Sequence, residues 1–260
     1  MFSVIRGGCF SRHSSSFIME RPHGLPYYVL LIIKTHAELE IGGIHKTCKP
    51  NSALLIKPDT PYSYKNPNGE YIDDWIHFTC TIDDLSEYDT LIFHTGFPIN
   101  NPGVLTTYIR QMLWESHFSV SPSKEHYVDT LFKLLLNHIY EDFNTNAIEE
   151  YNPYRYKLQR LRLEIQAAPY KKYTAKELAS NLKISASYFQ YLYKLFFDIS
   201  FHADIINMRI EYSKELIATT DLPFEQVAYS SGYSSEVHFY RQFLAKMSMT
   251  PGEYRKTYLR

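Results

Sequence analysis

The hydrophobic pattern of the chain changes its period about a third of the way along the sequence. Before that point, short apolar and aromatic runs such as Tyr28–Ile33 alternate with turn-forming clusters at Gly42–Gly43, Pro50–Ser52, Pro58–Asp59 and Asn66–Gly69. Runs of this kind, bounded by turns, are typical of β-strands. Because they follow one another closely, they predict a barrel or a sandwich. We expect its last strand at Trp75–Thr79.

Two amphipathic helices are predicted after Pro102. One helical face carries Val104, Leu105, Tyr108, Ile109, Met112 and Leu113, and the next carries Tyr127, Leu131, Leu134, Leu135, His138 and Ile139. Either helix can cap the open barrel, whereas the second can also pair with its copy in another subunit, and the pattern does not separate these alternatives. The polar segment Asn144–Asn152 lacks periodicity, so we place the linker there, between domains at residues 1–148 and 149–260.

The second domain is expected to be entirely helical, and it contains an internal repeat. Glu177–Ser185 aligns with Gln226–Ser234, which superposes Ala179 on Ala228 and Ser185 on Ser234, 49 residues apart. In each copy a short helix is followed by a four-residue turn, a serine N-cap and a second helix, at about residues 187–196 and 236–246. The alanine leaves room for two helices that cross steeply. Gly232 can take positive φ in the turn, where the first copy has Lys183. Two helix-turn-helix units are therefore predicted.

The second helix of each unit has an outward face that fits the DNA major groove, which admits one α-helix. Candidate readers of base edges on this face are Ser187, Gln190 and Tyr191 in the first unit, and Val237, His238 and Arg241 in the second. Gln190 is suited to adenine and Arg241 to guanine. Lys194 and Lys246 are candidates for phosphate contacts, which position a protein without specifying sequence. The stretch Ser200–Thr219 predicts a helix that connects the units and sets them into successive major grooves.

The charge distribution agrees with a nucleic-acid partner although the net charge of the whole chain is -1. Residues 154–260 contain 16 Lys and Arg against 10 Asp and Glu, a net charge of +6. This leaves 11 against 18, a net charge of -7, for residues 1–153. Such asymmetry indicates that the C-terminal end meets a polyanion, and we expect double-stranded DNA.

Other sequence features argue against several classes of protein. Cys9, Cys48 and Cys80 are odd in number and widely spaced, so we expect reduced, buried thiols and no zinc or disulfide framework. No signal peptide or membrane-spanning run is found, which favours a cytoplasmic protein without a membrane partner. A barrel enzyme would need clustered metal ligands, whereas His36, His45 and His77 are scattered. We therefore expect no catalysis, no metal and no other cofactor.

Three C-terminal segments, Arg209–Ile217, Val227–Tyr233 and Thr250–Arg255, form a specific pattern. Together they resemble the AraC/XylS family of transcriptional regulators, over about Tyr154–Lys256. The chain departs from the family at Ser213, where alanine is usual, and at Asp198 and Ser248, where a glycine usually closes each recognition helix. The resemblance implies a DNA-binding regulator.

The N-terminal half contains three shorter matches, at Glu20–Gly24, Leu54–Pro58 and Trp75–Phe78. They are similar to the cupin-like sensing domain of a sugar-responsive member of that family. By position, the resemblance implies that Arg21, Tyr62, Tyr64 and Trp75 line a sugar pocket, with Tyr62 in place of a histidine. A tryptophan face can stack on a pyranose while arginine and tyrosine groups bond its hydroxyls. The resemblance also implies a homodimer through the helix at about residues 124–143.

The sequence as a whole predicts an α+β protein, with an N-terminal cupin-like β-barrel and two helices, followed by an all-α domain with two helix-turn-helix units. We expect a transcriptional regulator that responds to a small polar effector such as a carbohydrate. An N-terminal assembly or protein-interaction module without an effector remains an alternative, and a cupin enzyme is a less favoured one. Arg21 separates the first two, since a position inside the barrel beside Trp75 and Tyr64 favours a small ligand and an outside position favours assembly.

Overall fold

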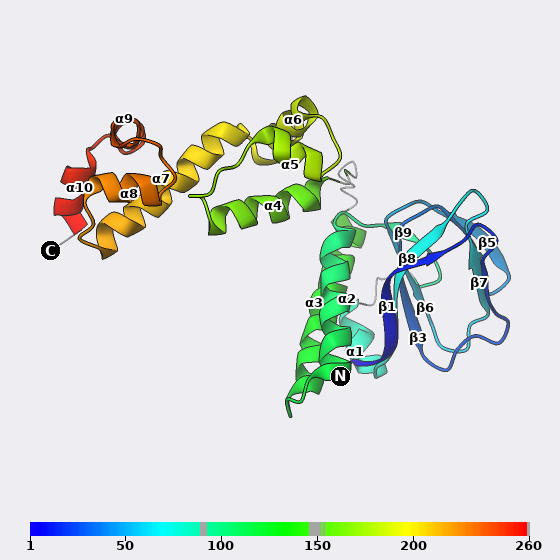
Figure 1. Cartoon of the computed structure of the whole chain (residues 1–260). Helices are drawn as coiled ribbons and strands as arrows, with labels where there is room; N and C mark the ends of the chain where they lie inside the picture. Colours follow the sequence, from blue (N-terminus) through cyan, green and yellow to red (C-terminus); the bar gives the residue numbers. More distant parts are fainter. Residues whose placement is uncertain (89–92, 146–151, 153, 259–260) are drawn as a thin grey trace. The chain divides into compact units, whose positions relative to one another are not determined.

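The chain is divided by its internal contacts into two compact units, Met1–Tyr151 and Asn152–Arg260, which we call unit 1 and unit 2 (Figure 1). The computed structural model describes residues 1–88, 93–145, 152 and 154–258. Most of the expected linker, Asn144–Asn152, therefore lies outside the described residues. Within the described part, no helix is long and apolar enough to cross a membrane.

Unit 1 contains two antiparallel sheets. The larger sheet has the spatial order β1 (Ser3–His13), β8 (Tyr71–Thr79), β3 (Tyr28–Ile33), β6 (Ser52–Ile56) and β9 (Phe97–Pro98). The smaller sheet has the order β2 (Ile18–Arg21), β7 (Tyr62–Lys65), β4 (Ala37–Ile41) and β5 (Ile44–Cys48). Among the described strands no backbone ladder joins the two sheets, so the expected closed barrel is not found and a sandwich stands in its place.

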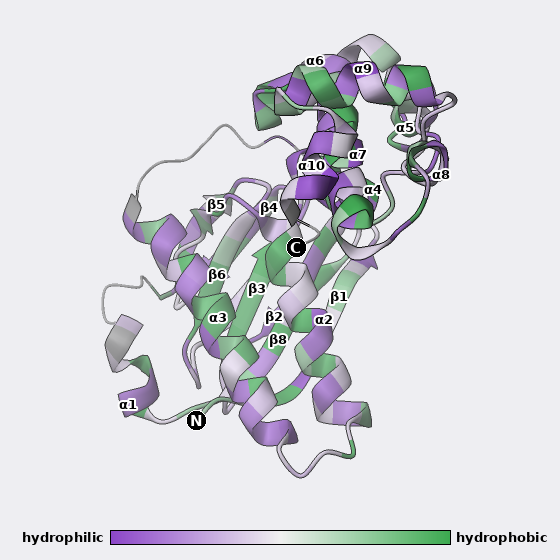
Figure 2. Ribbon diagram, turned by 90° about the vertical axis from the view of Figure 1, so that its left-hand side faces the viewer, coloured by the Kyte–Doolittle hydropathy of each residue, from purple (hydrophilic) through white to green (hydrophobic). Residues whose placement is uncertain are grey.

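The two sheets bury a common apolar layer between them. Leu31 and Leu54 contribute from the larger sheet, and Leu39 and Ile41 from the smaller one. The central strands β3 and β6 are buried along nearly their whole length because both of their faces are covered. This explains why Tyr28–Ile33 reads as a continuous apolar run, coloured largely as hydrophobic in Figure 2, and not as an alternating one.

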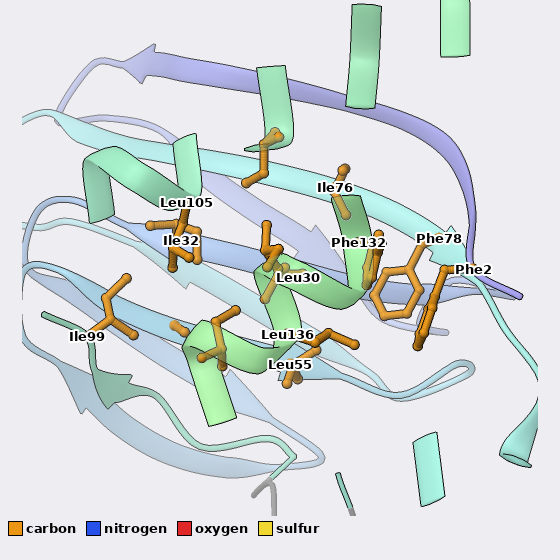
Figure 3. Close-up of a cluster of buried hydrophobic side chains, with 14 of the residues drawn as sticks. Phe2, Leu30, Ile32, Leu55, Ile76, Phe78, Ile99, Leu105, Phe132 and Leu136 are labelled. Atoms are coloured by element: carbon orange, nitrogen blue, oxygen red, sulfur yellow. The ribbon is translucent and has the colours of Figure 1, made fainter. Parts of the chain in front are cut away.

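Two helices cover the other face of the larger sheet, α2 (Pro102–Phe118) and α3 (Lys124–Thr145). Their buried side chains, including Leu105, Phe132 and Leu136, pack on Leu30, Ile32, Leu55, Ile76 and Phe78 of the strands (Figure 3). The Phe2 ring stacks on Phe132 with centroids 4.7 Å apart. Both helices therefore belong to the core of unit 1. Short helical turns at α1 (Ile82–Leu85) and Ser86–Tyr88 precede them.

The apolar face expected for α3 is only partly the face that the structure buries. Leu135 and Ile139 are buried as expected, together with Val128, Phe132 and Leu136. In contrast, Tyr127 and Leu134 are each 43% exposed. The helix thus has two apolar stripes side by side, and a single-period analysis merged them.

The expectation for the last strand of unit 1 was also wrong. Strand β8 begins at Tyr71, four residues before the expected start at Trp75, and the short strand β9 follows it in the chain. The acidic pair Asp73 and Asp74 concealed the first half of β8, because buried carboxylates are uncommon in strands. Strand β9 has two residues, which is too few to show a period.

The carboxylates of Asp73 and Asp74 lie on opposite faces of β8, and the structure treats them differently. Asp74 faces the helices, where it pairs with Lys34 at 2.6 Å, accepts a hydrogen bond from the Thr106 hydroxyl, and accepts a second from the Phe10 backbone N–H at 2.7 Å. Asp73 faces the interior of the sandwich with 1% exposure, and neither of its oxygens has a hydrogen-bond partner among the described residues. Burial, and to a lesser degree Asp74, raises the pKa of Asp73 to about 7, although the nearby Tyr71 hydroxyl offsets part of the rise.

Unit 2 consists of helices within its described residues. They are α4 (Arg155–Ala167), α5 (Ala175–Asn181), α6 (Ala186–Phe197), α7 (Phe201–Thr219), α8 (Phe224–Ser230), α9 (Glu236–Met247) and α10 (Pro251–Tyr258). Helix α7 joins two small cores, since Phe201 and Ile205 pack with α4–α6 while Ile210 and Ile217 pack with α8–α10. The expected connecting helix is confirmed.

Replacing Asp73 by asparagine removes the unpartnered buried carboxylate and is expected to stabilise unit 1 above about pH 7. The carboxyl titrates near 3.8 in the unfolded chain and near 7 in the folded one, so the folded state binds this proton more tightly between those values. Stability therefore falls as pH rises from about 4 to about 7, and the whole penalty is present above that range. We expect Asp73→Asn to exceed the wild type by on the order of 2–4 kcal/mol at pH 8, and by little at pH 4.5.

Urea unfolding followed by tryptophan fluorescence measures this difference, because both tryptophans, Trp75 and Trp114, lie in unit 1. Burial lowers the pKa of His77 to about 4, which gives the opposite pH dependence, but this contribution is common to both proteins and cancels in the difference. Asp59→Asn, at an exposed turn, is the control. A stability difference that does not change with pH would contradict the assignment.

Candidate nucleic-acid interface and effector pocket

The first helix-turn-helix is formed by α5 and α6, and its local geometry follows from three residues. Thr174 caps α5 by accepting a hydrogen bond from the Glu177 backbone N–H, and Ser185 caps α6 by accepting one from Tyr188. Ala179 is 1% exposed where the two helices approach each other. The small side chain and the serine cap therefore occur where the repeat predicts them, whereas the turn before the cap, Leu182–Ile184, has three residues and not the expected four.

The second helix-turn-helix, α8 and α9, differs in one position from the expectation. Its N-cap is Ser235, which accepts a hydrogen bond from the His238 backbone N–H, and not Ser234, which the alignment pairs with Ser185. The turn Ser231–Ser234 is one residue longer than Leu182–Ile184, so α9 starts one residue later than a strict repeat predicts. Ala228 is fully buried, as expected.

Four residues at the ends of these helices adopt left-handed backbone conformations. Gly232 has φ +85° and Lys183 has φ 57° in the two turns, as the sequence predicts. Asp198 and Ser248 close α6 and α9 with φ 54° and 56°. These last two are the positions at which the family usually has glycine, so the chain keeps the conformation with residues that adopt it less readily.

The orientation of α6 is fixed by a buried carboxylate. Asp204, 3% exposed near the start of α7, accepts two hydrogen bonds from the Arg162 guanidinium of α4, at 2.7 and 3.2 Å. It accepts a third from the Tyr193 hydroxyl of α6 at 2.8 Å. Three helices thus share one charge, and this arrangement aims the outer face of α6 away from the core.

All four sequence-derived candidates on α6 lie on one exposed face. Ser187, Gln190, Tyr191 and Lys194 line a hollow of about 890 Å³ together with Leu195, Asp198, Ser200, Phe201 and His202. The hollow extends from α6 to the first turn of α7. Sequence analysis missed Leu195, which is 56% exposed, although its position four residues after Tyr191 places it on the same helical face.

The candidates on α9 fall into two groups. Val237 is 80% exposed, and Arg241 and Lys246 are also exposed. His238 is half-buried, its ring nitrogen lies 3.0 Å from the Gln242 amide nitrogen, and its ring meets Tyr233 edge-on. Val237 and Arg241 are therefore free to meet a ligand, whereas His238 is held within the domain.

The four candidate effector residues lie on inner strand faces of unit 1. Tyr62 and Tyr64 are buried with ring centroids 6.1 Å apart, and Trp75 packs against the same layer while its indole N–H donates to the Ser11 hydroxyl at 2.9 Å. Arg21 is half-buried and follows Met19, an inward residue two positions earlier on β2. Burial raises the pKa of Tyr62 and of Tyr64, and the positive charge of Arg21 offsets part of that rise.

Only part of this set shares a hollow in the structure. Arg21 and Tyr62 line a space of about 170 Å³ at the end of the smaller sheet, with Glu20, Pro22, Glu40, Gly43, Pro61 and Ser63. Tyr64 and Trp75 do not line it. This volume is smaller than the roughly 300–1,000 Å³ usual for ligand pockets.

Further polar groups that sequence analysis missed face the sandwich interior from β8. The Tyr71 hydroxyl, both oxygens of Asp73 and the Nδ1 atom of His77 are buried without a hydrogen-bond partner among the described residues. The Arg6 guanidinium lies 5.2 Å from the centre of the Trp75 ring. Alternation from Trp75 could have indicated His77 within the expected strand, and Asp73 only if the strand had been extended to Tyr71.

The sulfur and acidic groups give no competing centre in the described residues. Cys9, Cys48 and Cys80 are free thiols, Cys48 buried and the other two half-buried. Burial raises the pKa of Cys9 and of Cys80 to about 11, so neither is a ready nucleophile. No group of three or more His, Cys, Asp or Glu side chains in these residues could hold a metal ion.

Comparisons with known proteins match the C-terminal part of the chain. A family model described as a helix-turn-helix domain matches residues 178–257. The probable transcriptional regulator LumQ of Photobacterium leiognathi is 33% identical over 85 residues, which is 33% of this chain and 34% of the relative. The melibiose operon regulatory protein of Escherichia coli K12 is 28% identical over 83 residues, 32% of this chain and 28% of the relative. The matched segment thus spans about a third of the length of these curated relatives.

A solved structure also matches part of the chain. The C-terminal domain of AraT, a response regulator from Geobacillus stearothermophilus, is 28% identical, covers 42% of this chain and 88% of its own, and has a TM-score of 0.38. The residues matched by the family model include the second half of α5 and all of α6–α9, the segment in which one helix-turn-helix geometry occurs twice. Residues 178–257 of this chain therefore belong to a helix-turn-helix domain, which agrees with the resemblance of the sequence to the AraC/XylS family.

Proposed function

We propose that the chain is a transcriptional regulator that binds specific double-stranded DNA sequences through α6 and α9. The observation that carries the proposal is the repeated helix-turn-helix, in which the second helix of each copy presents an exposed polar face. Each such helix fits one major groove. The net charge of +6 over residues 154–260 favours association with the phosphate backbone.

The exposed side chains divide between base reading and phosphate contact. Gln190 on α6 matches the donor and acceptor pattern of adenine, and Arg241 on α9 matches that of guanine. Ser187, Tyr191 and Val237 contact base edges beside them, with the Val237 methyl groups suited to the methyl group of thymine. His238 contributes by holding Gln242 at the edge of this surface. Lys194 and Lys246 are exposed on the later turns of their helices and contact phosphates.

Unit 1 is proposed to be a cupin-like sensing domain, over about residues 1–148, that binds a small polar effector such as a sugar. Support comes from the inward position of Arg21, the aromatic layer of Tyr62, Tyr64 and Trp75, and the unpartnered buried oxygens of Asp73. Unpaired buried polar atoms are costly, and a ligand with several hydroxyl groups would satisfy them.

The relative named for a melibiose operon matches only 32% of this chain and 28% of its own length, so it does not test the sensing role of unit 1. The sensing role therefore rests on the interior of unit 1. For a ligand to regulate DNA binding, it must bind one arrangement of the regulator better than another.

A homodimer through α3 is proposed from the second apolar stripe of that helix. Tyr127, Leu131, Leu134 and His138 recur at spacings of four, three and four residues, with Leu131 half-buried against the core and the other three exposed. This is the spacing by which two helices pack against each other in a coiled coil. Tyr127 and Leu134 are each 43% exposed, so pairing would bury them.

Arg241→Ala and Lys194→Ala are expected to weaken DNA binding in different ways. Loss of Arg241 should cost about 1–3 kcal/mol on the preferred sequence and relax the requirement at one base pair. Loss of Lys194 should weaken binding almost equally on all sequences and reduce the salt slope by about one. The preferred sequence is first selected from random duplexes with the wild-type chain, and affinities are then measured on that duplex and on an unrelated one. Equal losses on both duplexes for both variants would rule out these roles.

Binding of a polar effector is expected to raise the thermal midpoint of unit 1, followed by tryptophan fluorescence. A ligand at about 100 times its dissociation constant adds roughly 2.7 kcal/mol, enough to raise the midpoint by several degrees. The panel consists of mono- and disaccharides, with Arg21→Ala as the test variant and Arg12→Ala, an exposed arginine, as its control. A shift that is lost only in Arg21→Ala supports the pocket, whereas no shift with any sugar favours the assembly module.

Leu134→Glu is expected to convert a dimer of the chain into a monomer at micromolar concentration, because a charge would be buried in the helix pair. Light scattering coupled to size exclusion gives the mass directly. His126→Glu, on an exposed part of α3 away from the stripe, should leave the mass of the dimer unchanged. A wild-type chain that is already monomeric, or a Leu134→Glu variant that stays dimeric, excludes this interface.

A further inference from the structure

One arginine of the connecting helix links the two helix-turn-helix units by a route other than the helix itself. Arg209 lies near the middle of α7 and is half-buried. Its Nε donates to the Pro169 carbonyl at 3.0 Å, and its Nη2 donates to the Lys171 carbonyl at 3.1 Å. Both carbonyls belong to the loop between α4 and α5, which leads into the first helix-turn-helix.

The same guanidinium also reaches the second helix-turn-helix. Its carbon lies 5.9 Å from the ring centre of Tyr233, which is 4% exposed in the turn between α8 and α9. Arginine is suited to this position, because its planar fork can donate in two directions while its face lies on an aromatic ring. A lysine could not make both contacts at once.

Beside this arginine, the turn of the second helix-turn-helix touches the loop that leads into the first. A Cβ atom added to Gly232 would lie 2.6 Å from the carbonyl oxygen of Tyr170 and 2.8 Å from its Cα, so the glycine is needed for close approach as well as for its φ of +85°. The Tyr170 ring also lies 5.7 Å from Tyr212 on α7. The loop 169–171 is therefore held between α7 and the turn that joins α8 to α9. We name Arg209, this loop and Gly232–Tyr233 the Arg209 clamp.

The clamp changes how the distance between the two recognition helices is controlled. If α7 were the only connection, each helix-turn-helix would be attached to one end of a 19-residue helix. Small bends or rotations at the ends of that helix would then alter the separation of α6 and α9. A second point of attachment, away from the helix ends, removes that freedom. The recognition helices then meet DNA at one separation, which lowers the entropy lost on binding a correctly spaced site.

We propose that Arg209 is a positioning residue that fixes the separation of α6 and α9, and so makes the regulator selective for the spacing between the two base sequences that they read. This inference rests on the proposed DNA-binding function. Arg209 contacts the loop and the turn and is not itself placed against DNA.

The test measures affinity as a function of spacing, with the full chain. From the selected DNA sequence, duplexes are made with zero, one, two or three base pairs inserted between the segment read by α6 and that read by α9, and one duplex keeps a single segment. The variants are Arg209→Ala, Arg209→Lys and Gly232→Ala. Lys214→Ala is the matched control, because it removes one positive charge from the same helix without touching the clamp.

For the wild type and the Lys214→Ala control, insertion of two base pairs should reduce affinity roughly 30-fold or more, towards that of the single-segment duplex. For Arg209→Ala the loss on insertion should shrink to roughly threefold, while affinity for the single-segment duplex stays within about twofold of the control. Arg209→Lys should lie between them. Gly232→Ala should flatten the spacing profile by the same means, since the added methyl pushes the turn from Tyr170.

A clamp variant whose spacing profile is as steep as that of the control overturns the inference. Circular dichroism identifies any variant that fails to fold. If Arg209→Ala fails, the comparison rests on Arg209→Lys, which keeps the charge and most of the side chain. A steep spacing profile for Arg209→Lys together with an unchanged profile for Gly232→Ala also overturns the inference. A wild-type chain with no sequence preference at all would instead refute the proposed function, so the two failures can be told apart.

Discussion

The buried carboxylate of Asp204 is the interaction on which the first recognition helix depends. A charge in an apolar interior is tolerated only when it is paired and hydrogen-bonded, and Asp204 receives three donors from Arg162 and Tyr193. These contacts require α4, α6 and α7 to meet at one point and in one orientation. Removing any one donor would leave part of the charge uncompensated, so the arrangement specifies geometry more strictly than apolar packing would. The second recognition helix has no equivalent in the described residues and is held by aromatic packing of Phe239, Phe243 and Tyr254.

The two helix-turn-helix units of unit 2 are therefore held in place by different kinds of interaction. The first helix-turn-helix is centred on a polar network that is intolerant of displacement, whereas the second is centred on non-directional packing of aromatic rings. The contact of Gly232 with Tyr170 brings the turn of the second helix-turn-helix against the loop that precedes the first. This contact helps to fix the position of the second helix-turn-helix relative to the polar network. Unit 2 therefore needs one buried, paired carboxylate and not two.

The sequence predicted unit 2 well because its signals are local and occur twice. Two small residues, two capped helices and two turns with a left-handed residue can be read from single positions, and the repeat checks one copy against the other. The error at Ser234 arose where the copies differ, since one added turn residue moves the cap to Ser235. Asp204 and Arg209 could not be assigned in advance, because their partners lie up to 42 and up to 40 residues away and only the folded chain brings them together.

In unit 1 the strands were predicted but their arrangement was not, because pairing of strands distant in sequence leaves no periodic signal. The run at Tyr28–Ile33 indicated a strand covered on both faces, yet not that two sheets rather than one closed barrel would supply the cover. The second stripe of α3 was merged with the first for a similar reason, since both are apolar and only the sheet distinguishes them.

Neighbouring Asp73 and Asp74 show how structure and function place different demands on one strand. Asp74 is accounted for by folding alone, because Lys34 and the Thr106 hydroxyl compensate its charge and tie β8 to β3 and α2. Asp73 has the same burial without a hydrogen-bond partner among the described residues, and the nearby Tyr71 hydroxyl offsets only part of the rise in its pKa, so its effect on stability is unfavourable at neutral pH. An asparagine would fill the same volume without that cost. Under the sensing role proposed for unit 1, a ligand that donates hydrogen bonds to Asp73 would recover the lost stability on binding.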